Sequence, residues 1–187
     1  MGLVLASASP RRRSLLASAG VVVAGVRPAD IDESRRPSEE PVAYATRLAL
    51  EKAQKAIDDH HWVLAADTIV QLGDDVLGKP TDRADAHAML RRLAGRTHLV
   101  TTAWTLAGPG GADVRSGSST TAVTFRPLTD DEIDAYLDLG ESMDKAGAYG
   151  AQAHGVTLID RIEGSLTTVI GLPVPPVLDA LAAVGLR

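Results

Sequence analysis

The segment that most constrains the fold is WVLAADTIVQL, at residues 62–72. It is too long and too apolar for a surface strand, so it predicts a central strand of a sheet. The residues GDD that follow form a turn, and VLGKP after them predicts the second strand of a hairpin. Any fold of this chain must cover both faces of the segment at 62–72.

The remaining segments alternate between helix and strand, which predicts an α/β fold. Further strands are expected at 3–7, 98–108, 114–125 and 156–162, the two middle ones forming a long hairpin. Helices are expected from Pro10 to a stop at Gly20, and at 42–58, 81–93, 129–140 and 175–185. We find no internal repeat and no linker, which predicts one domain over residues 1–187.

Composition excludes several classes of protein and site. The chain has no cysteine, which excludes disulfides, thiolate nucleophiles and sulfur-ligated metals, so a metal would need oxygen or imidazole ligands. A net charge of −5 and 3% aromatic residues argue against nucleic acid and anionic membranes as partners. The N-terminal basic cluster follows the apolar stretch instead of preceding it, unlike a secretory signal, so we expect a cytoplasmic protein.

The stretch SASPRRRSLL, at residues 7–16, places three arginines in the first turn of a predicted helix. Ser9 suits the N-cap and Pro10 the first helical position. The macrodipole disfavours each arginine there by a few tenths of a kcal/mol or more, roughly. A strand, a tight turn and a helix N-terminus form a common phosphate site, so this segment predicts an anionic ligand near Arg11 and Arg12.

Two charged residues interrupt apolar patterns. Lys52 lies in the middle of the apolar face of the helix at 42–58, either with its amine extended to water or as a cation directed into a site. Asp67 interrupts the central strand, where an unpaired carboxylate would cost several kcal/mol. It either bonds to a neighbouring loop or forms part of a site, and Thr68 beside it should point to the opposite face.

Two weaker candidates complete the set. Glu33 belongs to the acidic stretch DIDES, in a polar loop at 26–41, where such charges are usually only solvated. Lys79 follows the hairpin and could approach Asp67 across the ladder. Four cations and two carboxylates are what a polyphosphate and a divalent metal require; the cations are Arg11, Arg12, Lys52 and Lys79, and the carboxylates Glu33 and Asp67.

These motifs resemble the Maf-like nucleoside triphosphate pyrophosphatases. LASASPRRRSLL, DIDES, RLALEKA, AADTIVQL, LGKP, DKAGAYGAQAHG and GSLTTVIGLPV occur in the family's order and spacing, from residue 5 to about 175. The chain is most similar to the dTTP/UTP pyrophosphatase branch. It departs from the family at Leu166 and Thr168, where an aromatic residue and an asparagine are common.

The resemblance implies a curved mixed sheet flanked by helices, with a cleft between two lobes, and a divalent cation, Mg²⁺ or Mn²⁺. It implies that Arg11, Thr68 and Gln152 shape base specificity and that Asp67 is the proton acceptor. The Gln152 amide offers one donor and one acceptor, which can match uracil or thymine, although a solvated loop glutamine would be ordinary. Family precedent also favours a homodimer.

Together these inferences predict an enzyme that hydrolyses dTTP or UTP, and modified pyrimidine nucleotides, to the monophosphate and pyrophosphate. In this hypothesis Asp67, Lys52 and Lys79 are catalytic and Glu33 and Asp67 bind metal; the substrate is bound by Ser7, Arg11, Arg12, Thr68 and Gln152. The resemblance implies a role in clearing non-standard nucleotides or arresting cell division. The alternatives are a non-catalytic nucleotide sensor that regulates division, and a phosphatase that releases orthophosphate.

Overall fold

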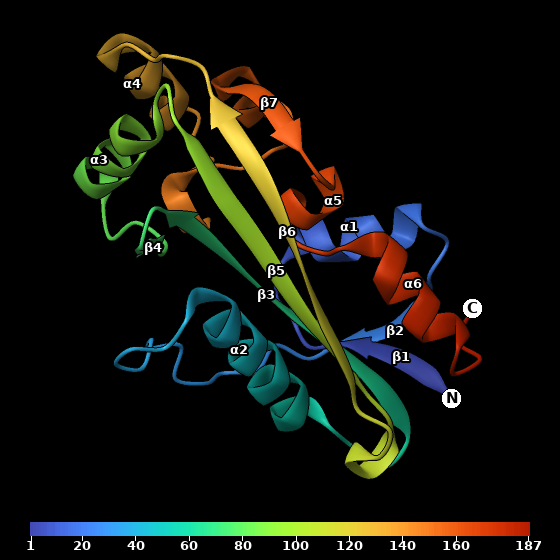
Figure 1. Cartoon of the computed structure of the whole chain (residues 1–187). Coiled ribbons are helices and arrows are strands. Elements are labelled where there is room, and N and C mark those ends of the chain that lie inside the picture. The colour runs from blue at the N-terminus through green and yellow to red at the C-terminus, as the bar shows by residue number, and fades with distance from the viewer. The chain divides into compact units, whose positions relative to one another are not determined.

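The sheet in the computed structural model, which describes residues 1–187, is open and mixed and is flanked by helices (Figure 1). Its seven strands follow the order β2-β1-β3-β5-β6-β7, with β4 paired to β3. The strands are β1 Gly2–Leu5, β2 Val23–Val26, β3 His61–Leu72, β4 Asp75–Leu77, β5 Thr97–Ala107, β6 Arg115–Phe125 and β7 Ile159–Glu163. The predicted α/β class is therefore confirmed.

The α-helices are α1 Pro10–Ser18, α2 Pro41–Ala56, α3 Arg83–Leu93, α4 Asp130–Asp138, α5 Leu166–Ile170 and α6 Val174–Ala182. Four of the α-helices lie between strands in the chain, and α5 and α6 follow β7. Short 3-10 helices form η1 Pro109–Gly111, η2 Ala146–Ala148 and η3 Ala153–Leu158. None of the helices combines the length and the apolar character that crossing a bilayer demands.

The chain divides into two compact units, and strands β3, β5 and β6 contribute residues to both. Unit 1 contains Met1–Asp67, Thr102–Ser119 and Gly171–Arg187, and unit 2 contains Thr68–Thr101 and Thr120–Ile170. The division falls between Asp67 and Thr68, two of the predicted site residues.

In unit 1 the strands are covered by α1 and α6 on one face and by α2 on the other (Figure 1). Because side chains alternate along a strand, even-numbered residues of β3 pack against α1 and α6, and odd-numbered ones against α2. The first cluster includes Trp62, Leu64 and Ala66 with Leu16 and Leu181, and the second includes Val63 and Ala65 with Ala53 and Ala56. This covering on both faces explains why residues 62–66 are continuously apolar.

Unit 2 has a core of its own, formed where α3 and α4 pack with the strand segments 68–72, 97–101 and 120–125. Strand β4 pairs antiparallel with β3, and β7 pairs antiparallel with β6. Three rings meet edge to face in this core, with centroids 4.7 to 5.4 Å apart; they belong to His98, Phe125 and Tyr149.

Most predicted elements are confirmed within a few residues, but five details differ. Strand β2 and helix α5 were not predicted, since each is too short to show a periodic pattern. The expected strand at 156–162 begins only at Ile159, after η3. The cap of α3 is Asp82 instead of Thr81, and Ser9 caps α1 by position without a side-chain hydrogen bond.

Candidate functional site

A buried lysine lies between two carboxylates in unit 1. Lys52 Nζ is 2.6 Å from Asp67 Oδ1 and 2.6 Å from Glu33 Oε1. Lys52 is only 9% exposed and Asp67 8%, whereas the Glu33 side chain is 48% exposed. The amine of Lys52 therefore does not extend to water but is buried between two carboxylates.

The alternation along β3 explains why these two residues meet. Asp67 continues the odd-numbered series that packs against α2, and Lys52 lies on the buried face of α2 beside Ala53 and Ala49. The helix pattern predicted that face correctly, because Ala45, Leu48, Ala49, Ala53 and Ala56 are all buried.

The positive charges around Asp67 oppose the effect of burial on its pKa. Burial raises the pKa of the Asp67 carboxyl group, while the positive charges of Lys52 and Arg12 lower it, and burial is the larger effect. Burial also lowers the pKa of Arg12, and the nearby charge of Asp67 raises it. The first turn of α1 and the central strand therefore place opposite charges within electrostatic range of each other.

Arg12 is oriented by two hydrogen bonds. Its Nε donates to the carbonyl oxygen of Gly171 at 2.8 Å, and its Nη1 donates to Ser7 Oγ at 2.9 Å. Ser7 Oγ also accepts from the backbone N–H of Ser9 at 3.2 Å. Ser7, which is buried, thus joins the end of β1 to the guanidinium group of Arg12.

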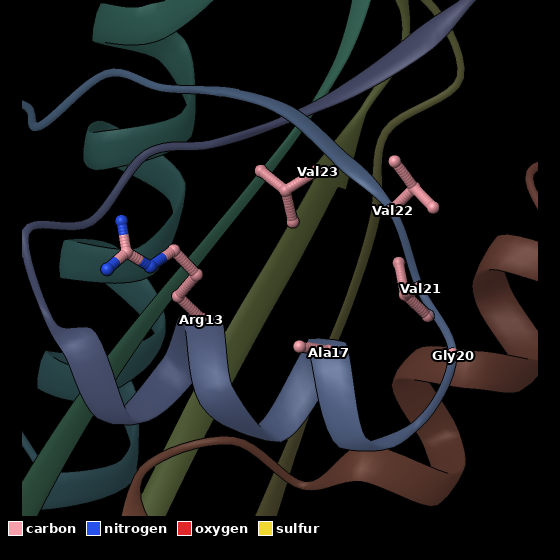
Figure 2. Close-up of a pocket in the computed structure, with 6 residues that line it drawn as sticks. All are labelled: Arg13, Ala17, Gly20, Val21, Val22 and Val23. Carbon is pink, nitrogen blue, oxygen red and sulfur yellow. The ribbon is translucent and has the colours of Figure 1, made fainter.

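The three arginines of α1 do not share one environment. Arg11 is partly buried and Arg13 is exposed. Figure 2 shows Arg13 beside a separate, largely apolar hollow that is lined by Ala17 of α1 and by residues 20–23, which lead into β2. Arg13 therefore lines a different surface from the one that Ser7 and Arg12 form.

Glu33 is carried by residues 27–40, which form neither helix nor strand. Side chains of α2 bind the backbone of this loop: Tyr44 Oη donates to the Glu33 carbonyl oxygen at 2.6 Å, and Arg47 Nη2 donates to the Ser34 carbonyl oxygen at 3.0 Å. The sequence pattern did not single out Tyr44, because an aromatic residue on a half-exposed helix face carries no distinctive signal.

The carboxylates of Glu33 and Asp67 fit a hard divalent cation. Both bind the same ammonium group, so their oxygens are close enough to share one positive ion. No group of three or more acidic or histidine side chains in residues 1–187 is placed so that it could hold a metal ion. Two carboxylates, with the other positions left to water and phosphate oxygens, are a usual donor set for Mg²⁺.

Arg11 belongs to unit 1 as well, and three predicted site residues belong to unit 2. Thr68 is half-buried on β3, Lys79 is exposed two residues after β4 ends, and Gln152 is half-buried immediately before η3. The structure therefore brings together Ser7, Arg12, Glu33, Lys52 and Asp67 within unit 1, and places these three residues in the other unit.

The loop that carries Gln152 is tightly constrained. A Cβ atom at Gly155 would lie 1.9 Å from the carbonyl oxygen of Gly150, so only glycine fits there. Ala148 and Ala153 have φ of 62° and 49°, a region that alanine rarely adopts. Strain of this kind is typical of loops with a defined conformation, and Gln152 lies within this one.

Comparison with known proteins relates this arrangement to one family. A family model described as Maf-like protein matches residues 2–184. A dTTP/UTP pyrophosphatase of Myxococcus xanthus is 48% identical over 186 residues, which cover 98% of this chain and 93% of that protein. One of Geobacter sulfurreducens is 45% identical over 185 residues, covering 98% and 96%.

Among solved structures, a HAM1 protein from Coxiella burnetii matches with a TM-score of 0.49 at 14% identity, covering 91% of this chain and 87% of that one. The family model and the curated relatives each extend over nearly the whole chain, including β1, α1, α2 and β3, which carry the cluster around Lys52. The chain therefore belongs to the Maf-like protein family.

Proposed function

We propose that this protein hydrolyses dTTP and UTP to the nucleoside monophosphate and pyrophosphate. The observation that carries the proposal is the buried Lys52 between Glu33 and Asp67, with the charge of Arg12 acting on the same aspartate. Curated relatives at 45% and 48% identity are named dTTP/UTP pyrophosphatase. A polyphosphate needs cations to bind its oxygens and a carboxylate to accept a proton from water, and unit 1 contains both.

The start of α1 would bind the triphosphate. Arg12 is held by Ser7 and Gly171, so its guanidinium group is oriented before substrate arrives. A guanidinium group and the N–H groups of a helix N-terminus both bind phosphate oxygens. This role explains why arginines occupy a first turn whose dipole disfavours them. We assign Arg11 to the same role.

Glu33 and Asp67 would hold a divalent cation, Mg²⁺ or Mn²⁺. When bound, such an ion neutralises charge on the phosphates and lowers the pKa of a coordinated water. Lys52 would keep both carboxylates ionised and oriented through its 2.6 Å contacts. Lys79 of unit 2 is proposed as a further cation for the phosphates.

Asp67 would accept the proton of the attacking water. The water oxygen forms a bond to the α-phosphorus, the bond from that phosphorus to the bridging oxygen breaks, and pyrophosphate leaves with the electron pair. Burial raises the pKa of Asp67, which makes it a stronger proton acceptor than an exposed aspartate. Lys52 orients the carboxylate for this transfer.

Base selection is assigned to Arg11, Thr68 and Gln152. A glutamine amide can donate to a carbonyl oxygen of uracil or thymine and accept from its N3–H, and a base that leaves those groups unpaired is rejected. We infer that the enzyme works in the cytoplasm and clears non-standard pyrimidine nucleotides.

The products distinguish this activity from its alternatives. Purified protein is incubated with dTTP, UTP, dATP and dGTP in the presence of Mg²⁺, and the products are separated by ion-exchange chromatography. We expect pyrophosphate and the monophosphate from dTTP and UTP. Saturable binding without products would instead identify a nucleotide sensor, and orthophosphate as the first product would identify a phosphatase.

A further inference from the structure

Glu33 lies in the loop at 27–40, which forms neither helix nor strand. The regular backbone hydrogen bonds of a helix or sheet therefore do not fix the position of its carboxylate. Three side chains of α2 hold it instead. Tyr44 binds the carbonyl oxygen of Glu33 at 2.6 Å, Arg47 binds the next carbonyl oxygen, that of Ser34, at 3.0 Å, and Lys52 binds the carboxylate at 2.6 Å. The backbone on both sides of the Glu33–Ser34 bond is therefore tied to one helix.

Arg47 also anchors the far end of the same loop. Its Nε and Nη2 donate to Glu39 Oε1 and Oε2 at 2.7 and 2.9 Å, a bidentate pair whose side chains are only 13% and 11% exposed. Its Nη1 donates to Glu51 of α2 at 3.2 Å. These hydrogen bonds lower the pKa of Glu39 to about 2, so the pair stays charged throughout the range in which an enzyme works.

Glu39 is in turn hydrogen-bonded to residues in the middle of the loop. Its Oε2 accepts from the backbone N–H of Arg36 at 3.0 Å, and its carbonyl oxygen accepts from the Arg35 side chain at 2.6 and 2.9 Å. The guanidinium group of Arg47 also lies 5.5 Å from the centre of the Tyr44 ring. One planar group thus contacts the loop at Ser34 and Glu39 and the residue that binds Glu33.

We propose that Arg47 and Tyr44 are positioning residues, which hold the Glu33 carboxylate where it binds the divalent cation. This inference rests on the proposed function, in which Glu33 is a metal ligand. Lysine cannot replace Arg47, because an ammonium group cannot bind both oxygens of Glu39 in a fixed plane and reach the Ser34 carbonyl as well. A displacement of about 1 Å at a metal ligand is enough to weaken the site.

The test compares Arg47→Lys and Tyr44→Phe with Arg115→Lys. Arg115 forms a similar bidentate pair with Asp113 at 3.0 and 3.1 Å, in the same unit but outside the loop, so it controls for the general loss of such a pair. Mn²⁺ binding without nucleotide is measured by electron paramagnetic resonance of the free ion. Amide hydrogen exchange of residues 27–40 and the Mg²⁺ concentration for half-maximal dTTP hydrolysis are measured on the same samples.

We expect Arg47→Lys to weaken Mn²⁺ binding about 10-fold and Tyr44→Phe about 3-fold, in line with the loss of hydrogen bonds to a charged and a neutral donor. Exchange at 27–40 should accelerate in both variants, and excess Mg²⁺ should restore most of kcat. Arg115→Lys should match the wild type in all three measurements. Because Tyr44→Phe removes only a hydroxyl group, it tests the proposal even where Arg47→Lys fails to fold.

Glu33→Gln separates the two hypotheses. If Glu33→Gln weakens Mn²⁺ binding while Tyr44→Phe and folded Arg47→Lys bind as the wild type does, the positioning role is wrong and the proposed function stands. If Glu33→Gln binds Mn²⁺ and hydrolyses dTTP like the wild type, the metal-binding role of Glu33 is itself wrong. Loss of kcat in Arg47→Lys that excess Mg²⁺ does not restore would also overturn the positioning role.

Discussion

Burying either Asp67 or Lys52 without the other would be energetically unfavourable. Each carries a charge that is costly to bury alone, and a pair with a separation of 2.6 Å offsets much of that cost. Replacing such a pair with apolar residues often stabilises a fold, so stability alone does not account for it. At the residue scale, this pair is the strongest sign of a functional site in unit 1.

Asp67→Asn should lower kcat for dTTP by about 10²- to 10⁴-fold, the usual contribution of a general base. The fold should persist, because Glu33 still neutralises Lys52 when the aspartate is gone. Pyrophosphate release measures the activity, and circular dichroism of the same sample checks the fold. A folded variant with the wild-type rate would show that Asp67 is not the base.

His98 should make stability depend on pH. It is 2% exposed, Nδ1 has no hydrogen-bond partner, and burial lowers its pKa from 6.5 to about 4. Between these two values the unfolded chain binds a proton that the folded chain does not, so the free energy of unfolding falls as pH decreases. The shift corresponds to about 3 kcal/mol.

His98→Gln isolates this effect, because glutamine stays neutral at every pH and still has a polar group for the Tyr149 hydroxyl, which lies 2.7 Å from His98 Nε2. Urea unfolding at pH 7, 6, 5 and 4 gives the free energy for both proteins. We expect the wild type to lose about 3 kcal/mol more than the variant over this range. Parallel losses would mean that His98 is protonated in the folded state as easily as in the unfolded chain.

At the scale of elements, helix ends show where local sequence decides structure. Thr129 and Glu132 form a complete capping box at the start of α4, in which each side chain accepts from the other's backbone N–H. The pattern of these two residues alone predicted this helix. Ser9 also occupies a cap position, but its side chain makes no cap hydrogen bond, and its backbone N–H donates to Ser7 Oγ.

These two caps give a matched pair of substitutions. Thr129→Ala should lower the free energy of unfolding by about 1 kcal/mol, because it leaves the backbone N–H of Glu132 without its acceptor. Ser9→Ala should change stability by no more than a few tenths of a kcal/mol, roughly, since no cap hydrogen bond is lost. Urea unfolding of both variants measures the difference, and equal losses would contradict this account of the two caps.

At the scale of the whole molecule, β3, β5 and β6 connect the two units through continuous backbone. Because these three strands belong to both units, we propose that the units unfold together, as the predicted single domain would. Both tryptophans, Trp62 and Trp104, belong to the core of unit 1. Their fluorescence therefore reports on that unit.

Urea unfolding followed by tryptophan fluorescence and by far-ultraviolet circular dichroism tests this proposal. We expect the two curves to coincide, because circular dichroism reports on both units and fluorescence on unit 1. A second transition seen only by circular dichroism would show that the units unfold separately.

Local chemistry predicted much of the fold and part of the site. The central strand, the buried face of α2, the hairpin of β5 and β6 and the capping box each depend on neighbouring residues, and all were predicted. The anomalies at Lys52 and Asp67 were visible for the same reason, since a charge inside an apolar pattern is a local feature. That the two residues bind each other was not visible, because they are far apart in the chain.

By itself, the sequence determined the α/β class and the elements long enough to carry a periodic pattern, because periodicity and capping are properties of consecutive residues. It also identified Lys52 and Asp67 as charges within apolar patterns, which require a partner of opposite charge when they are buried. Only the tertiary structure decided what those partners are: Lys52 for Asp67 and Glu33, Ser7 and Gly171 for Arg12, and Tyr44 and Arg47 for the loop of Glu33. These contacts join residues from separate elements, and only the packing of β1, β3, α1 and α2 brings them within bonding distance.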